Sequence, residues 1–182
     1  MSERRTTQIL ENSLTGSKDG LKMAGYAQDF VFTGNCFSVT DVLTIAGSTT
    51  VSFIFDCSLA NEAGKLVVNL PAQFTSTGGP VLVTIYGGTD YTGVNNLNIL
   101  NRNANSNINP LCTLKDTATG SLKGVKTSCV IVPGSTTGAF SSSGSEKGEL
   151  EFVVDSVNYL IEIENQDTNS IQLGYKFIFF EV

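Results

Sequence analysis

Glu162 and Glu164 are the two acids whose spacing could support chemistry. They stand two residues apart in the apolar run 158–165, and side chains on an extended strand repeat every two residues, so both carboxylates are expected on one face. Paired carboxylates serve as acid and base in glycoside hydrolysis. Nothing in the sequence places either acid in an apolar pocket, however, and acids at this spacing are more simply solvent-facing. We therefore expect no catalytic residue.

Other chemical signals are also missing from the sequence. The chain has no histidine, which is the usual general base and a common metal ligand. It carries no phosphate-binding loop, no GxSxG motif, no dinucleotide fingerprint and no EF-hand spacing. These absences predict a protein that is not an enzyme and that needs no metal or cofactor.

Four cysteines, Cys36, Cys57, Cys112 and Cys129, are spread widely along the chain. No CxxC pair and no histidine accompanies them, so a zinc site is not expected. They could pair in three ways. With synthesis in the cytoplasm we expect free, buried thiols, and disulfides formed after cell lysis are the alternative.

Asparagine occupies every second position from Asn101 to Asn109, and Arg102 follows the first of them. A period of two predicts an extended segment whose amides project from one face, among them Asn101, Asn103 and Asn105. Each amide has two donors and an acceptor, and an arginine has five donors, so this row could fasten a long connection to a neighbouring strand or to a partner chain. The alternative is a polar surface loop.

These motifs resemble structural proteins of tailed bacteriophages. The resemblance is carried by residues 81–88, by the Leu-Asn-Arg-Asn run 100–103 with its Asn/Ser continuation, and by the ending from 158 to Glu181. It covers roughly residues 78–182. It implies an auxiliary head protein, that is, a decoration or cement protein on the outside of the capsid.

Several expectations follow from the resemblance. The partner would be the major capsid protein, and the protein would form a homo-oligomer, with a trimer favoured. It would reside on the capsid surface after synthesis in the host cytoplasm. The alternative is a receptor- or glycan-binding β-sandwich of a phage tail or fibre. Such a site usually stacks an aromatic ring on the sugar, and Tyr86 and Tyr91 beside the Gly87-Gly88 loop could do so, although the chain has no tryptophan.

Composition narrows the class of partner. The 182 residues are 41% hydrophobic, enough for one domain with a full core, and only 15% charged, against about 25% in ordinary soluble domains. A neutral polar surface suits a protein packed against neighbours. The net charge of −6 argues against nucleic-acid binding, which needs clustered Lys and Arg. Late acids, including Glu181, are expected to face solvent. No run approaches the ~20 apolar residues of a membrane span.

Short β-branched and aromatic runs, separated by Gly, Pro, Ser and Asn turns, predict an all-β fold. Runs are expected at 30–32, 36–39, 42–45, 51–55, 65–70, 81–86, 111–114, 128–132, 149–154, 159–164 and 171–180. No 3.6-residue period persists, so any helix is one or two turns. We expect a single β-sandwich or jelly-roll-like domain over 26–182, preceded by an extended N-terminal arm over 1–25.

The two ends of the chain are the expected interface. In the arm, Ile9 and Leu10 could lie across a neighbouring subunit, and Arg4 and Arg5 could meet an acidic capsid groove. In the last strand, one face turns from polar to apolar at Ile178 and Phe180, which predicts cover on both sides there. The cover could be internal, supplied by the arm or by a loop. It could also be another subunit, and this alternative is favoured.

Overall fold

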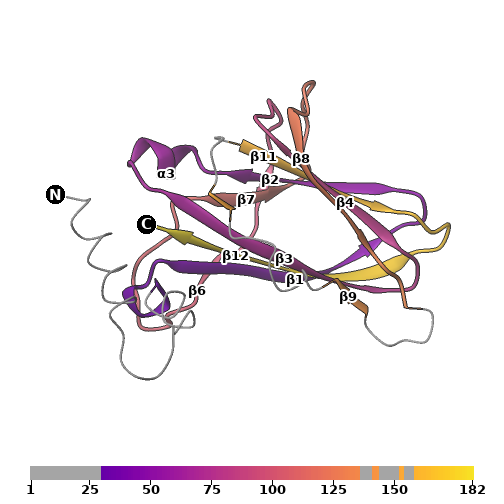
Figure 1. Cartoon of the computed structure of the whole chain (residues 1–182), viewed down its shortest axis with the longest axis horizontal. Coiled ribbons are helices and arrows are strands. Elements are labelled where there is room, and N and C mark those ends of the chain that lie inside the picture. The colour runs from indigo at the N-terminus through magenta and orange to yellow at the C-terminus, as the bar shows by residue number, and fades with distance from the viewer. Residues whose placement is uncertain (1–29, 136–140, 144–151, 154–157) are drawn as a thin grey trace, which may run out of the picture.

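The computed structural model of the chain is a sandwich of two antiparallel sheets (Figure 1). It describes residues 30–135, 141–143, 152–153 and 158–182. Sheet A contains β1 (Cys36–Ile45), β3 (Val67–Thr77), β6 (Leu100–Asn101), β9 (Ser141–Ser143), β10 (Phe152–Val153) and β12 (Ile171–Glu181). Sheet B contains β2 (Thr50–Asp56), β4 (Val81–Gly87), β5 (Asn95–Asn96), β7 (Thr113–Asp116), β8 (Val125–Val132) and β11 (Asn158–Asn165).

The order of the long strands is that of a jelly roll. In sheet A, β9 and β10 pair with β3, which is followed by β12 and β1, and in sheet B the order is β8, β4, β11, β2. The consecutive pairs β1–β2, β3–β4 and β11–β12 each cross from one sheet to the other, and their turns gather at one end of the sandwich (Figure 1, right). The expectation of an all-β sandwich is confirmed.

Alternating apolar residues of the facing strands fill the space between the sheets. Phe37 of β1 and Phe55 of β2 both contact the ring of Phe179 in β12, at centroid distances of 5.5 and 5.1 Å. All three side chains are buried. Offset and edge-on ring contacts at these distances add to the free energy of burial. The aromatic residues of the predicted strands therefore form the core that joins the two sheets.

Two local differences from the predicted strands have a physical cause. Residues 30–33 form a helical turn, not a strand, and Gly34, at φ +77°, ends it by donating its N–H to the Val31 carbonyl. Strand β3 continues through Pro71, beyond the predicted end at Leu70. The pairing with β12 shifts there, between Lys176 and Ile178, and such a bulge accommodates a proline.

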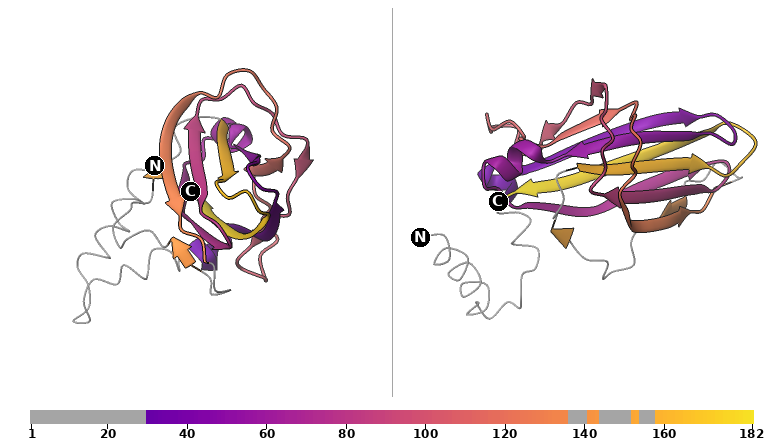
Figure 2. Two further views of the ribbon diagram at one scale, coloured as in Figure 1. Left: turned by 90° about the vertical axis from the view of Figure 1, so that its right-hand side faces the viewer. Right: turned by 90° about the horizontal axis from the view of Figure 1, so that it is seen from above.

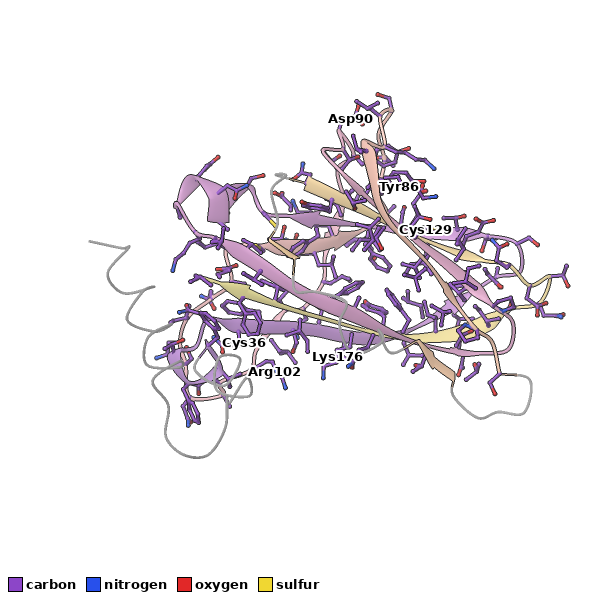
Figure 3. All side chains as sticks on the ribbon, in the orientation of Figure 1. Cys36, Tyr86, Asp90, Arg102, Cys129 and Lys176 are labelled. Carbon is purple, nitrogen blue, oxygen red and sulfur yellow. The ribbon has the colours of Figure 1, made fainter. Side chains whose placement is uncertain are left out.

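The short helix α3 (Ser58–Glu62) follows β2 and agrees with the expected single turn or two. A long connection, residues 88–124, leaves β4 and returns as β8. On the way it adds β7 and β5 to the far edge of sheet B and β6 to the edge of sheet A. It begins and ends in a projecting pair of loops, in which Asp90 accepts hydrogen bonds from the N–H groups of Ser121 and Leu122 at 3.0 and 2.8 Å (Figure 3, top).

Candidate interaction surface

The asparagine row is a series of turns and not an extended strand. Beyond Leu100–Asn101 the chain makes bends and turns, so the strand prediction is wrong there. The side-chain oxygen of Asn101 accepts the N–H of Asn103 at 2.9 Å, and that of Asn103 accepts the N–H of Asn105 at 3.0 Å. A side chain that bonds to the backbone two residues later also repeats every two residues. At Asn101 and Asn103 the period of two therefore reflects consecutive Asx turns.

The amide nitrogens of the row fasten it to the turn at residues 30–34. Asn101 donates to the carbonyl oxygens of Gly34 and Ile108 at 2.8 and 2.9 Å, and Asn103 donates to that of Phe32 at 3.0 Å. The side chains of Asn101 and Asn103 therefore bond to carbonyl oxygens of their own chain. Their amides are engaged inside the protomer.

The turn held in this way covers the apolar end of β12. Phe30 and Val31 pack on a small cluster formed by Cys36, Val68, Ile178 and Phe180 on the outer face of sheet A. The rings of Phe30 and Phe180 lie 5.0 Å apart, and Phe180 is 1% exposed. Cover on both sides of β12 was expected, and at Phe180 the chain itself supplies it. Ile178 and Phe180 therefore need no second subunit to be buried.

Arg102 makes different contacts from those expected. Its backbone N–H donates to the Cys36 carbonyl at 2.9 Å, and both residues are labelled in Figure 3. Burial raises the pKa of the Cys36 thiol, and the nearby charges of Arg102 and Lys176 oppose the rise. The Arg102 side chain remains exposed.

The two candidate acids, Glu162 and Glu164, have different surroundings: the first forms an ion pair and the second faces solvent. The Glu162 carboxylate lies 2.8 Å from Lys123 Nζ, whereas Glu164 is exposed. The hydrogen bond that Lys123 donates to this carboxylate raises the pKa of Lys123. The same ammonium group lies 5.6 Å from the centre of the Tyr86 ring, within the range of a cation–π contact. One face of Tyr86 is thus already covered by a side chain of the protein.

Tyr91, the other candidate stacking residue, is half-buried beside the same loops. A Cβ added at Gly120 would lie 2.4 Å from its ring, so the backbone of the opposite loop packs closely on this tyrosine. The protein itself thus covers part of each ring, which leaves less of both rings for stacking on a sugar.

Glu181 has a role that its sequence context did not reveal. It was expected to face solvent, but it is 3% exposed, so this expectation is wrong. Its carboxylate accepts the N–H groups of Leu111 and Cys112, each at 2.8 Å. A buried carboxylate is stabilised by such donors, and in return it fastens the start of β7 to the end of β12. No local motif marks this role, because its donors lie about 70 residues away.

The open edge of β8 is the longest run of exposed strand residues in the described part of the chain. Strand β8 pairs with β4 on one side and ends sheet B on the other (Figure 2, left, orange). All of its residues except Val132 are exposed, including Val125 at 74% and Ile131 at 68%. From Thr127 to Val132 it carries no charge. Natural edge strands are usually protected by charges, prolines or bulges, and here these devices lie at the ends, at Lys126, Pro133 and the bulge opposite Ile85.

The remaining predicted sites fall outside this surface. Arg4, Arg5, Ile9 and Leu10, with the arm over 1–25, lie outside the described residues. Asn105 is exposed in the turn series, and its backbone N–H takes part in the second Asx turn. Within the described ranges, no group of three or more His, Cys, Asp or Glu side chains is placed to hold a metal ion. The same ranges contain no helix long and apolar enough to cross a membrane.

The chain matches no protein-family model, no curated protein and no solved structure. The resemblance to auxiliary head proteins of tailed phages therefore stays a prediction from short motifs.

Proposed function

We propose that this chain is a structural protein of a tailed-phage virion, which binds the outside of the capsid shell and stabilises it. The observation that carries the proposal is the edge of β8, which is uncharged from Thr127 to Val132 and exposes apolar side chains on both faces, on a sandwich whose sequence is only 15% charged. The jelly-roll strand order is compatible with virion proteins, but many unrelated functions use it, so it adds support at the level of fold alone.

The proposed contact is the addition of an extended segment of the major capsid protein to β8. An edge strand offers unpaired N–H and C=O groups, which give affinity without side-chain matching. Val130 and Ile131 stand on opposite faces of β8 because they are consecutive residues of a strand, and both are exposed. A strand laid along this edge would gain apolar contacts on both faces.

The stabilising mechanism is mass action. A protein that binds the assembled shell, and not its separated subunits, shifts the equilibrium toward the intact particle. A homotrimer, as the resemblance suggests, would repeat the β8 edge three times around one axis and multiply the attachment. Particles without the protein should assemble normally but open sooner on heating or osmotic shock.

The receptor- or glycan-binding alternative has less support. Its stacking residues would be Tyr86 and Tyr91, and the first is covered by Lys123 while the second packs on Gly120.

The test is co-sedimentation of the purified protein with heads that lack it. Ile131→Lys places a charge on the β8 edge, and Val42→Lys is the matched control, because Val42 is similarly exposed, at 63%, on β1 of the other sheet. We expect Ile131→Lys to stay folded and to lose most of its binding, while Val42→Lys binds like the parent. A parent protein that stays in the supernatant, or a copy number of a handful per virion by mass spectrometry, would reject the proposal.

A further inference from the structure

Cys57 and Cys112 come together where β2 and β7 end. The two strands pair antiparallel with Phe55 opposite Leu114 and Asp56 opposite Thr113. Both cysteines lie just beyond the paired residues, Cys57 before α3 and Cys112 in the bend before β7. Extending the register by one residue would set Cys57 opposite Cys112. Side chains of directly opposed residues project to the same side of a sheet, and both cysteines are 0% exposed in the main core. The Cys57 thiol is one cause of the raised pKa of Cys112, which agrees with the two side chains being neighbours.

The backbone bonds define which kind of cross-strand pair this is. The N–H of Cys112 donates to Glu181, and the carbonyl of Cys57 accepts the N–H of Asn61 in α3. The backbone of Leu114, two residues along, likewise points away from β2, because its carbonyl accepts the N–H of Leu97. Cys57 and Cys112 therefore form a non-hydrogen-bonded pair.

Such a pair has the geometry that a disulfide needs. Residues of a non-hydrogen-bonded antiparallel pair have Cα atoms about 4.5 Å apart, with side chains closer than in the other class. Disulfides join Cα atoms about 4.4–6.8 Å apart, so no strand has to move far. We propose that Cys57 and Cys112 form a cross-strand disulfide under oxidising conditions, which locks the inserted connection 88–124 to β2 of the jelly roll.

The oxidant is a small disulfide such as oxidised glutathione. One cysteine thiolate attacks it, forms a mixed disulfide and releases one reduced glutathione. The second cysteine then attacks the mixed disulfide, forms the Cys57–Cys112 bond and releases the second glutathione. Two thiols lose two protons and two electrons, and the oxidant takes up both electrons.

Access to the thiols sets when this reaction occurs. The neighbouring Cys57 thiol and burial hold the pKa of Cys112 well above its ordinary value, so the thiolate is scarce in the folded protein. Bond formation is therefore expected while the chain folds, or when the short strand β7 opens locally. The cytoplasm keeps thiols reduced, whereas the surroundings of a lysed cell do not.

The other two cysteines supply internal controls. Cys36 is buried on the outer face of sheet A, in a different cluster. Cys129 is exposed on β8. A reaction governed by exposure alone would modify Cys129 first and leave Cys57 and Cys112 reduced.

The test is refolding of the full chain at about pH 8 in a mixture of oxidised and reduced glutathione, followed by peptide mass spectrometry without reduction. We expect a peptide pair that joins Cys57 to Cys112, with Cys129 carrying glutathione. The oxidised protein should melt roughly 5–15 °C above the reduced protein. In the Cys57→Ala/Cys112→Ala variant, the same treatment should leave the melting temperature unchanged.

The proposal is independent of the function proposed above and can fail separately. The peptide map uses the unsubstituted chain, so it does not depend on how well the variant folds. Unlinked Cys57 and Cys112 in a sample whose Cys129 is modified would overturn the proposal. A different dominant pairing, or a linked protein that melts no higher than the reduced one, would overturn it as well.

Discussion

The side-chain amide of Asn103 donates a hydrogen bond to the carbonyl oxygen of Phe32 at 3.0 Å, across 71 residues of sequence. This bond joins the connection between β4 and β8 to the turn that precedes β1. The turn in turn carries Phe30, whose ring packs on Phe180. The asparagine row looks like a polar surface loop, but it helps to hold Phe30 against the small apolar cluster on the outer face of sheet A.

Replacing Asn101 with alanine should destabilise the fold more than replacing Asn103. Asn101 donates to two carbonyl oxygens and accepts one N–H, whereas Asn103 donates to one and accepts one. Each partner left unpaired in a partly buried site costs about 1–3 kcal/mol. We expect a loss of about 2–3 kcal/mol for Asn101→Ala and about 1–2 kcal/mol for Asn103→Ala in urea unfolding.

Asn105→Ala is the matched control, because it removes the same side chain from the exposed part of the row. It should stay within about 0.5 kcal/mol of the parent. If all three variants had the same free energy of unfolding as the parent, the side chains of the turn series would contribute nothing to stability, and the row would be only a solvated loop.

Phe180→Ala should strongly destabilise the isolated protein. The side chain is 1% exposed and packs under Phe30, so its truncation leaves a cavity that costs about 3–5 kcal/mol. Phe32→Ala is the control: its ring is 77% exposed, its backbone carbonyl is retained, and the change should be small. Thermal unfolding of the two variants measures both changes, and we expect a much lower melting temperature for Phe180→Ala than for Phe32→Ala. If Phe180→Ala melts like the parent, the contact with Phe30 is not formed in solution.

Most of the fold could be predicted from the sequence because the patterns that determine the strands and turns are local. Apolar alternation and turn residues placed most of the long strands, from β2 to β12, within a few residues. The prediction was wrong at Phe30–Phe32, where three apolar residues look like a strand but form a helical turn that ends at Gly34. A run of three residues is too short to distinguish the two periods, and its contact with Phe180 lies about 150 residues away in the sequence.

The candidate site shows a second limit. A period of two has two physical sources, the pleat of a strand and the reach of an Asx turn, and Asn101 and Asn103 use the second. Distinguishing them requires knowing which backbone groups are already paired. The role of Glu181 and the pairing of Cys57 with Cys112 likewise depend on strand register, and spacing along the chain does not contain that information.

Glu181→Gln should destabilise the protein although it preserves the shape of the side chain. Both 2.8 Å bonds from Leu111 and Cys112 end on the same carboxylate oxygen, which glutamine keeps, but an NH₂ group replaces the second oxygen. That oxygen accepts the N–H of Leu111 at 3.1 Å, and the NH₂ group would place a donor against this donor in a buried site. A buried donor left without a partner costs about 1–3 kcal/mol. Glu164→Gln is the control, since Glu164 is exposed on β11. Indistinguishable denaturation midpoints for the two variants would remove the proposed fastening of β7.

Asp56 should make stability depend on pH. Burial opposes its ionisation, but hydrogen bonds from Ser58 and the Lys115 ammonium at 3.2 Å outweigh burial and lower its pKa below 3.8. A carboxylate whose pKa is lower in the folded state than in the unfolded state stabilises the fold above about pH 3.8. This stabilisation disappears as the pH falls through the folded-state pKa.

Urea unfolding of the parent and of Asp56→Asn measures this contribution. At pH 7 the parent should be more stable by about 1–2 kcal/mol, at the low end for hydrogen bonds to a charged group because the Asp56 side chain is partly exposed. This difference should disappear in acid. Ser58→Ala removes one neutral donor to the same carboxylate and should narrow the gap without abolishing it. A gap between parent and Asp56→Asn that stays constant from neutral pH into acid would mean that the charge of Asp56 contributes nothing, and that the asparagine differs only in shape and donor pattern.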